Sequence, residues 1–338
     1  MDQRATILVT GATGLVGAHL LYALTAQGQC VRATRRHNSS TNFVDWVFGL
    51  YTQTPNSQLN MIDWVEADLL DYESLQAATE SISTVYHAGA VVSFSPADSQ
   101  SILATNVLGT ANLVDACIYN GVAELCHISS VASLGKPNSR GIIDEQCDWD
   151  TRRGRSVYAQ SKFMGENQAW RAMEMGLRVV VLNPSVILGP GRWDSGSGQL
   201  FSRVKRGMPF YTNGTSGYVD VRDVARAAIR LMSDANIAGE RFVLNAQNIS
   251  FADLFGLMAD AVGCRHPWFR VPRWTTALAY PLLWLGGLIS GKGNSLSWAN
   301  LQSAFKHSYY SAQKIEQRIG FEFIPIDQSI NFIAKQMG

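Results

Sequence analysis

Through the first half of the chain, short apolar runs alternate with longer segments of helical periodicity. The apolar runs have the length of strands and lie at residues 6–10, 30–34, 61–66, 84–87, 124–129 and 178–183. The helical segments lie at residues 15–26, 72–80, 101–119 and 156–175. Nearly continuous apolar strands separated by helices indicate a parallel sheet that is buried on both faces. The pattern therefore predicts a doubly wound α/β fold, whose ligand site lies beyond the carboxyl ends of the strands.

The alternation changes after Asn183, where proline and glycine interrupt the pattern. A helical segment at residues 221–233 and an apolar run at residues 241–245 then resume it. A chain of 338 residues exceeds the usual size of one simple core, so a large domain with a smaller lobe is expected. We assign residues 1–183 and 219–247 to the sheet domain, and residues 184–218 and 248–338 to a smaller, mostly helical substrate lobe.

Composition and charge exclude several classes of protein. With 28 basic and 27 acidic residues, the chain lacks the charge excess by which proteins bind nucleic acid. Its five cysteines form no C-x-x-C pair and its six histidines show no ligand spacing, so we expect reduced thiols and no metal. The polar start of the chain is too short for a signal peptide. These features favour a cytoplasmic location.

The most apolar segment of the second half spans residues 277–290 and reads ALAYPLLWLGGLIS. It is shorter than the ~20 residues that a membrane-spanning helix needs, and Pro281 and two glycines interrupt it. We therefore expect no integral span. A core or pocket-lining helix is the favoured interpretation, and a peripheral contact with a membrane surface is the alternative.

A glycine-rich loop, TGATGLVG at residues 10–17, joins the first apolar run to the first helical segment. Gly11 permits the tight turn, Gly14 lets the backbone approach a pyrophosphate, and Gly17 allows the helix to pack closely on the strand. The phosphates would bind the free N–H groups at the start of the helix. This context predicts a Rossmann-type dinucleotide site. The residues expected to line it are Gly11, Thr13, Gly14, Leu15, Val16 and Gly17.

The second strand indicates which dinucleotide is bound. NAD sites place an acid near the end of this strand to accept from the ribose 2′-hydroxyl, but residues 30–42 contain no acid. Arg35 and Arg36 occur there instead and suit a 2′-phosphate, because charge-assisted hydrogen bonds contribute about 1.5–3 kcal/mol each. We therefore predict NADP(H) rather than NAD(H). The alternative is that both arginines only solvate a strand end.

The ends of the next two strands complete the predicted cofactor site. Asp68 and Leu69 follow the third strand and would flank the adenine, with Asp68 accepting from its amino group. Ala88, Gly89 and Ala90 follow the fourth strand, and their small size would let the backbone approach the cofactor closely.

A tyrosine and a lysine form the candidate catalytic pair. Tyr158 and Lys162 are four residues apart in a helical segment, which puts both on one face. A cation near the phenol favours the phenolate and would lower the pKa of Tyr158 toward a useful range. Lys162 would also bind the nicotinamide ribose. The serine pair that ends the fifth strand supplies a hydroxyl that could stabilise charge on a substrate oxygen.

Eight motifs run in order along about two thirds of the chain: TGATGLVG, VRATRR, ADLLD, NVLGT, HISS, YAQSK, NPSVILGPG and YVDVRDVA. With them the chain resembles the extended short-chain dehydrogenases/reductases of the NAD-dependent epimerase/dehydratase superfamily. It is most similar to the branch of dihydroflavonol 4-reductases, cinnamoyl-CoA reductases and 3β-hydroxysteroid dehydrogenases. The resemblance leaves a monomer or a homodimer open.

The resemblance implies roles for single residues. Arg36, the last arginine of VRATRR, would meet the 2′-phosphate, and Ser130, the second serine of HISS, would be the catalytic serine. Pro184 and Ser185 would lie near the nicotinamide, and Asn106 would have a structural or proton-relay role.

Residues near the expected substrate pocket are less distinctive. Val92, Ser93 and Phe94 follow the fourth strand and could line the pocket, although Phe94 would also fit the core. The basic run at residues 152–155 could guide an anionic substrate, but a solvated loop is the favoured interpretation. Four tryptophans of the second half match no family pattern and suggest an apolar or aromatic small-molecule substrate.

These inferences predict an NADPH-dependent reductase of a ketone or aldehyde. A 3β-hydroxysteroid-type dehydrogenase is one alternative. A nucleotide-sugar epimerase or dehydratase is another, but Val131 and Ala132 stand where dehydratases carry an Asp-Glu pair, and epimerases bind NAD through an acid. The alternative outside catalysis is an NADP-sensing regulatory protein, which the presence of Tyr158 and Lys162 disfavours.

Overall fold

The computed structural model describes residues 5–93, 95–150, 155–275 and 304–337. Its centre is a seven-stranded parallel sheet with the order β3-β2-β1-β4-β5-β7-β11. These strands are β1 (Ile7–Thr10), β2 (Val31–Arg35), β3 (Ile62–Glu66), β4 (Thr84–His87), β5 (Glu124–Ile128), β7 (Arg178–Pro184) and β11 (Glu240–Leu244). Each predicted apolar run forms one of these strands, with ends that differ by at most one residue. The predicted doubly wound α/β fold is therefore confirmed.

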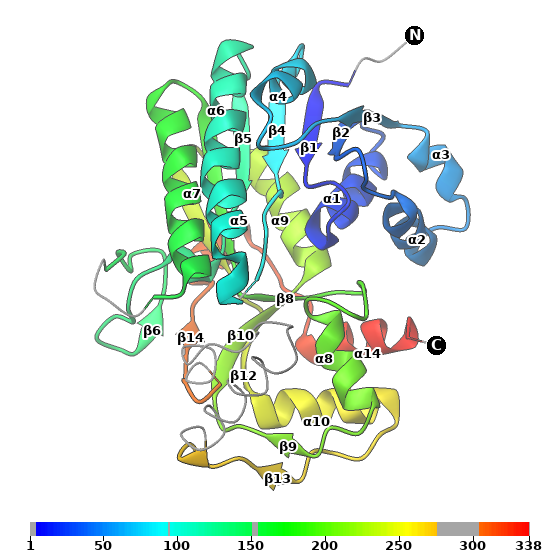
Figure 1. Cartoon of the computed structure of the whole chain (residues 1–338), viewed down its shortest axis with the longest axis vertical. Coiled ribbons are helices and arrows are strands. Elements are labelled where there is room, and N and C mark those ends of the chain that lie inside the picture. Colours follow the sequence, from blue (N-terminus) through cyan, green and yellow to red (C-terminus); the bar gives the residue numbers. More distant parts are fainter. Residues whose placement is uncertain (1–4, 94, 151–154, 276–303, 338) are drawn as a thin grey trace.

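Helices cover both faces of this sheet. On one face, α1 (Leu15–Thr25), α2 (Asn42–Tyr51) and α9 (Val221–Met232) bury their apolar side chains against the strands. On the other face, α4 (Tyr72–Thr79), α6 (Gly109–Tyr119) and α7 (Val157–Glu174) do the same. Figure 1 shows α6 and α7 side by side along the sheet. The short helix α3 (Pro55–Leu59) lies between α2 and β3 in sequence.

The helical segment predicted at residues 101–119 is interrupted by a π-helical turn. It consists of a 3-10 turn (Pro96–Asp98), α5 (Ser99–Leu103), a π turn (Ala104–Leu108) and α6. Within the described residues, the combined stretch Pro96–Tyr119 is long and apolar enough to cross a membrane by length and composition. Its helices pack against α4 and α7, so it is a core helix of the sheet domain.

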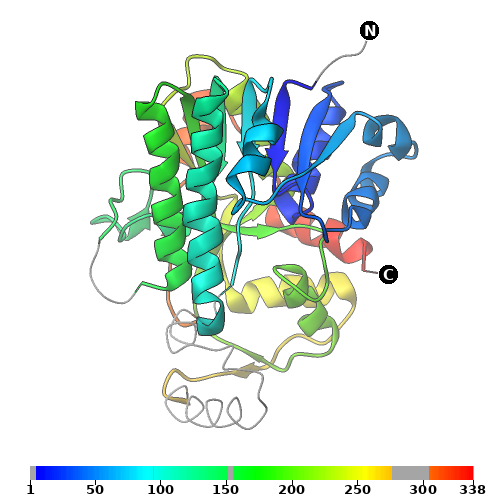
Figure 2. The same cartoon turned by 45° about the horizontal axis from the view of Figure 1, so that its top comes forward.

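After β7 the chain builds a second, smaller region (Figures 1 and 2). A three-stranded sheet of β8 (Val186–Leu188), β10 (Thr215–Asp220) and β12 (Gln247–Ser250) lies there, with β10 in the middle. Three helices, α8 (Gly198–Lys205), α10 (Phe251–Val262) and α14 (Ile326–Lys335), share an apolar core with it. The predicted apolar segment at residues 277–290 lies outside the described residues.

Short elements extend both regions. Two-residue strands pair in parallel as β6 (Ile142–Ile143) with β14 (Tyr309–Tyr310), and, within the smaller region, as β9 (Phe210–Tyr211) with β13 (Phe269–Arg270). The 3-10 turn η3 (Val131–Ser133) follows β5, and α13 (Gln313–Ile319) packs against β11. The chain crosses between the main sheet and the smaller region several times, since β8 follows β7, α9 follows β10, and β12 follows β11.

Candidate active site

The glycine loop forms a tight turn against the end of β4. Gly11 has a φ of +67°, and a Cβ added there would lie 2.5 Å from backbone atoms of Gly89. A Cβ on Gly17 would lie 2.2 Å from the carbonyl oxygen of Gly11. Side chains at these two positions would collide with the backbone of Gly89 and of the loop itself, and would prevent the close packing of the loop, α1 and the end of β4. The loop therefore has the bare backbone that a dinucleotide site requires.

The start of α1 offers free backbone donors. Leu15, Val16 and Gly17 are its first residues, and the N–H groups of a first turn have no partner within the helix. No side chain caps this end, and its first turn contains no acid. Thr13 precedes it in the turn and is half-buried. This terminus fits a pyrophosphate, which would accept from the free N–H groups.

The segment predicted to flank the adenine and the small residues predicted to approach the cofactor both meet the glycine loop. A Cβ added to Gly89 would lie 3.0 Å from the side chain of Leu69 and 3.5 Å from the backbone nitrogen of Gly11. Asp68 uses one carboxylate oxygen to accept from the backbone N–H of Leu70 at 2.9 Å. Ala88 donates its backbone N–H to the carbonyl of Thr10. The structure therefore brings residues 68–69 and 88–90 to one edge with the glycine loop.

The two arginines after β2 differ in their surroundings. Arg35 ends the strand, and its guanidinium lies 4.0 Å from the carboxylate of Glu66, which also pairs with His37 at 2.9 Å. Arg36 is exposed, and within the described part of the chain its guanidinium has no hydrogen-bond or ion-pair partner. Arg36 is therefore the cation that remains available for an anionic group at this edge.

The candidate catalytic tyrosine lies in the first turn of α7. Ser156 caps this helix, because its hydroxyl accepts from the backbone N–H of Ala159 at 3.2 Å. The hydroxyl of Ser130, which follows β5, hydrogen-bonds to Tyr158. Burial raises the pKa of the Tyr158 phenol, and the Ser130 hydrogen bond only partly opposes that shift. The predicted lowering of this pKa is therefore wrong for this structure, because burial disfavours the phenolate more strongly.

Lys162 is 5% exposed and lies one turn further along α7. Its ammonium donates to the backbone carbonyl of Ile128 at 2.9 Å. Burial lowers the pKa of Lys162 to about 8, and the carboxylate of Glu166 opposes that shift. Lys162 and Ser130 are thus both attached to the end of β5, although α7 begins almost thirty residues later.

Two buried histidines lie beside this lysine. His87 of β4 and His127 of β5 occupy paired positions in the sheet, with ring centroids 5.2 Å apart. His87 is held between the hydroxyls of Thr10 and Thr110 at 2.7 and 3.0 Å. Burial lowers the pKa of both imidazoles, to about 3 for His87, and the charge of Lys162 adds to the effect. Lys162 therefore has neutral neighbours on the sheet.

Comparison with known proteins assigns the chain to a family. Residues 7–245 match the model of the NAD dependent epimerase/dehydratase family. The chain belongs to this family. It is thereby an NAD(P)-dependent oxidoreductase or epimerase of the extended short-chain type.

Individual relatives place the chain near reductases of the family. It is 30% identical to a putative dihydroflavonol 4-reductase of Synechocystis sp., over 95% of this chain and 91% of the relative. It is also 30% identical to sterol demethylase protein B of Methylococcus capsulatus, over 79% and 77% of the two chains. The crystal structure of gox2253 has the same fold, with a TM-score of 0.80 and 25% identity over 99% of each chain.

The remaining predicted residues have mixed surroundings. Pro184 ends β7, and Ser185 beside it is 5% exposed, with a hydroxyl that has no hydrogen-bond partner in the described chain. Val92 is exposed, and the Ser93 hydroxyl donates to Asp98 at 2.6 Å. Phe94 lies outside the described residues.

Asn106 ties the loop after β4 to α7. Its side-chain amide accepts from and donates to the backbone of Val91, and it also donates to Ser161 at 3.0 Å. These hydrogen bonds would hold the loop after β4, which contains Val92 and Ser93, the residues predicted to line the substrate pocket. They favour a structural role for Asn106 over a role in proton relay.

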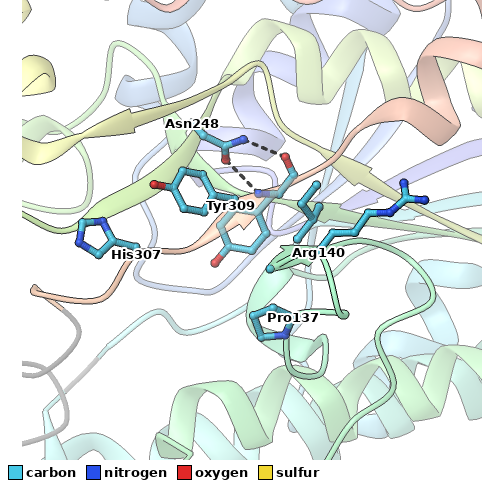
Figure 3. Close-up of a pocket in the computed structure, with 8 residues that line it drawn as sticks. Pro137, Arg140, Asn248, His307 and Tyr309 are labelled. Atoms are coloured by element: carbon cyan, nitrogen blue, oxygen red, sulfur yellow. Dashed lines mark hydrogen bonds between the residues drawn. The ribbon is translucent and has the colours of Figure 1, made fainter.

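A cavity of about 530 Å³ opens between the β6 loop and the strand β14 (Figure 3). Tyr309 lies between His307 and Arg140 in this view. Asn248 also lines the cavity, and its side-chain amide donates to and accepts from the backbone of Tyr310, both at 2.9 Å. No acid lines this cavity, whose full lining is Pro137, Arg140, Gly141, Ile142, Asn248, His307, Tyr309 and Tyr310.

Arg155 lies just before the start of α7. Burial lowers the pKa of Lys306 and the charge of Arg155 adds to this effect, whereas burial raises the pKa of Tyr310 and the charge of Arg155 only partly opposes it. Arg155 stacks on Trp149 and donates to the carbonyl of Leu134. It precedes Tyr158 by three residues, so its charge lies at the end of α7 that carries the candidate catalytic tyrosine.

The sequence did not point to a buried carboxylate in the same helix. Glu166 follows Lys162 by one turn and is 2% exposed. Its spacing of four from the lysine was a usable signal, because such residues share a helix face. Apart from Trp170 of the same helix, its partners come from the turn after β5, from β7 and from β11, and no local pattern could identify them.

Proposed function

We propose that the protein is an NADPH-dependent reductase of a ketone or aldehyde, acting reversibly on an apolar or aromatic compound. The observation that carries this proposal is the Ser130–Tyr158 hydrogen bond beside the buried Lys162, at the sheet edge that also holds the glycine loop. The 30% identity to a putative dihydroflavonol 4-reductase over nearly the whole chain supports it.

The proposed roles follow from the state of each group. The raised pKa keeps the Tyr158 phenol protonated at neutral pH, so it can give a proton to the oxygen of a substrate carbonyl. Ser130 would donate to the same oxygen and stabilise the negative charge that develops there. When bound, NADPH would supply the hydride. Tyr158 would regain its proton from solvent, and the product would be the alcohol.

The cofactor choice rests on Arg36. Arg35 is partly neutralised by Glu66, whereas the guanidinium of Arg36 is exposed and has no partner in the described chain. A 2′-phosphate would give it a charge-assisted hydrogen bond, which NADH cannot offer. Glycines 11 and 17, the start of α1 and the small residues at 88–90 would hold the rest of the dinucleotide.

The second region supports an apolar or aromatic substrate. Trp268 and Trp274 are 63% and 66% exposed, and Tyr309 and Tyr310 line the cavity near the start of α7. Aromatic side chains on the surface of a substrate lobe offer large apolar contact areas.

The test is a titration with NADPH and NADH, followed by fluorescence, for the wild type, Arg36→Ala and Arg206→Ala. Arg206 is an exposed arginine of the second region and is the matched control. We expect NADPH to bind at least about ten-fold more tightly than NADH, and Arg36→Ala to remove that preference. Equal binding of both nucleotides by the wild type would refute the cofactor assignment. Turnover of apolar ketones and aldehydes is then measured against polar sugars, and a preference for the sugars would refute the substrate class.

A second candidate is the oxidation of a hydroxysteroid. The relative named sterol demethylase protein B, which is 30% identical over most of the chain, favours it. The same residues would serve in the reverse direction, in which Tyr158 would first lose its proton to solvent and then, as the phenolate, accept the proton of the substrate hydroxyl. Measuring steroid alcohols with NADP⁺ against ketones with NADPH separates the two candidates.

A further inference from the structure

Glu166 is surrounded by donors that come from four parts of the fold. One carboxylate oxygen accepts from the hydroxyls of Ser129 and Ser133 at 2.7 and 2.6 Å and from the amide of Asn183 at 2.8 Å. The other oxygen accepts from the indole N–H of Trp170 at 3.3 Å and lies 3.5 Å from the Arg241 guanidinium. Three of these five partners can only donate, so the group is bound as a carboxylate.

Two of those donors also hold the turn that carries Ser130. The one hydroxyl proton of Ser133 is shared between the Glu166 carboxylate and the carbonyl oxygen of Ser130, which lies 2.7 Å from that hydroxyl, and the Asn183 amide lies 3.2 Å from the same carbonyl. The Ser130 hydroxyl in turn accepts from the backbone of Ala132. The carboxylate of Glu166 therefore orients the groups that fix the backbone from which the Ser130 hydroxyl reaches Tyr158.

The carboxylate also acts on Lys162 through its charge. The charged and titratable groups around this lysine are His87 from β4, His127 from β5 and Glu166 from its own helix. Both imidazoles are neutral, and Glu166 lies one turn along the same helix, so its carboxylate raises the pKa of Lys162 against the larger, lowering effect of burial. The one other cation beside Glu166 in the described residues is Arg241 of β11.

We propose that Glu166 is a positioning residue of the active site, which holds the turn of Ser130 in place and maintains the charge of Lys162. The inference rests on the proposed roles of Ser130 and Lys162. It accounts for a carboxylate that is buried among five donors one turn after Lys162, at a position where an apolar side chain would avoid the cost of burying a charge.

The decisive measurement is the titration of Lys162 in the whole protein without substrate. Lysine labelled with ¹³C at Cε is followed by NMR, and its signal is assigned by its loss in Lys162→Arg. We expect Glu166→Gln to lower the midpoint of Lys162 by about one to two pH units, because a nearby negative charge is removed. Glu166→Asp, which keeps the charge, should restore most of it. Glu174→Gln, an exposed glutamate of the same helix, should leave it unchanged.

The positioning of Ser130 is tested by turnover of a carbonyl substrate. Ser133→Ala removes a donor to the turn but keeps the charge, so we expect kcat to fall about ten-fold or more while the Lys162 midpoint stays constant. Glu166→Gln should lower kcat and also move the alkaline limb of the pH profile to lower pH. An unchanged Lys162 midpoint in Glu166→Gln, or a loss of thermal stability with normal kcat, would overturn the proposal. Because the NMR titration needs no substrate, failure to find any turnover would count against the reductase function and not against this inference.

Discussion

The two sides of the candidate site are built from different parts of the chain. The cofactor side, formed by Gly11, Gly89 and Arg36, consists of bare backbone and an exposed charge. The catalytic side, formed by Lys162 and Glu166 with the turn of Ser130, consists of buried polar side chains that hold one another. On the first side, shape determines whether a ligand fits. On the second, burial and neighbouring charge determine which protons are held.

The largest expected effect is on the catalytic side. Tyr158→Phe removes the proton that the substrate oxygen would receive, so we expect kcat to fall about 10²–10⁴-fold. NADPH binding should change little, since the cofactor side is intact. The measurement is steady-state turnover with fluorescence titration of NADPH in parallel.

Tyr86→Phe is the matched control for this substitution. Tyr86 is buried within β4 and packs in the main apolar core, whereas Tyr158 is half-buried at the start of α7. Its loss of a hydroxyl should affect stability and leave kcat within a few-fold of wild type. If Tyr158→Phe retained normal turnover, the comparison would fail, because the buried phenol would then be structural.

The fold was predictable because it depends on local patterns. Apolar runs of strand length mark all seven strands of the main sheet, and a strand at residues 241–245 was recognised even after the chain had left the sheet. The helix α2 was not predicted, although Val44, Val47 and Phe48 give it an apolar face. The sheet β8-β10-β12 was missed because β8 lies between prolines and glycines, and because polar residues and glycine interrupt the apolar pattern of β10 and β12.

A large effect is also expected on the cofactor side, from Gly11→Ala. The new Cβ would meet backbone atoms of Gly89 at 2.5 Å in a conformation with positive φ. Backbone atoms cannot move aside cheaply, so we expect a loss of about 2 kcal/mol or more in the free energy of unfolding and no detectable dinucleotide binding. Urea denaturation and NADPH titration measure the two effects.

Gly28→Ala is the control that isolates backbone strain. Gly28 has a φ of +79°, but a Cβ there would meet open space. We expect a cost of about 1 kcal/mol and normal NADPH binding. Normal binding by Gly11→Ala would show that the turn adapts and that the bare backbone is not required.

A smaller effect is expected on the pH dependence of stability, to which Lys162 of the catalytic side contributes. Burial lowers the pKa of Lys162 to about 8, whereas a lysine in the unfolded chain titrates near 10.4. Between these values the unfolded chain binds more protons, so stability rises with pH in this window. From pH 7 to pH 10 the wild type should therefore gain about 2–3 kcal/mol relative to Lys162→Met. Urea denaturation at both pH values measures this difference. Equal pH dependence in the two proteins would mean that Lys162 titrates as an exposed lysine.

The catalytic side was only partly predictable, for a physical reason. Tyr158, Lys162 and Ser130 stand in short motifs, and their relation could be predicted from the order of strands and helices. The pKa of Tyr158 was predicted in the wrong direction, because the degree of burial is not encoded in residue spacing. Glu166 could not be assigned for the same reason, since its donors Ser133, Asn183 and Arg241 come together only in the folded chain.

The smallest expected effect is on NADPH affinity, and it comes from a negative charge on the cofactor side. Glu66 of β3 lies 4.0 Å from Arg35 and has a half-exposed side chain, so it would repel a 2′-phosphate bound at this edge. Glu66→Gln should therefore tighten NADPH binding by about two- to five-fold, in keeping with the small energies of exposed charge pairs. NADH binding should not change, and about 0.5 M salt should remove most of the gain.

Asp63→Asn provides the matched control, because Asp63 is exposed on the same strand and pairs with Arg32 at 3.2 Å, away from the carboxyl edge of the sheet. It should alter neither affinity. An equal gain for NADH in Glu66→Gln would mean that the carboxylate acts on the shared part of the dinucleotide, and that the exposed charges on this side do not choose between the two cofactors. A gain confined to NADPH would mean that these charges choose the nucleotide, while the buried groups of the catalytic side control the proton.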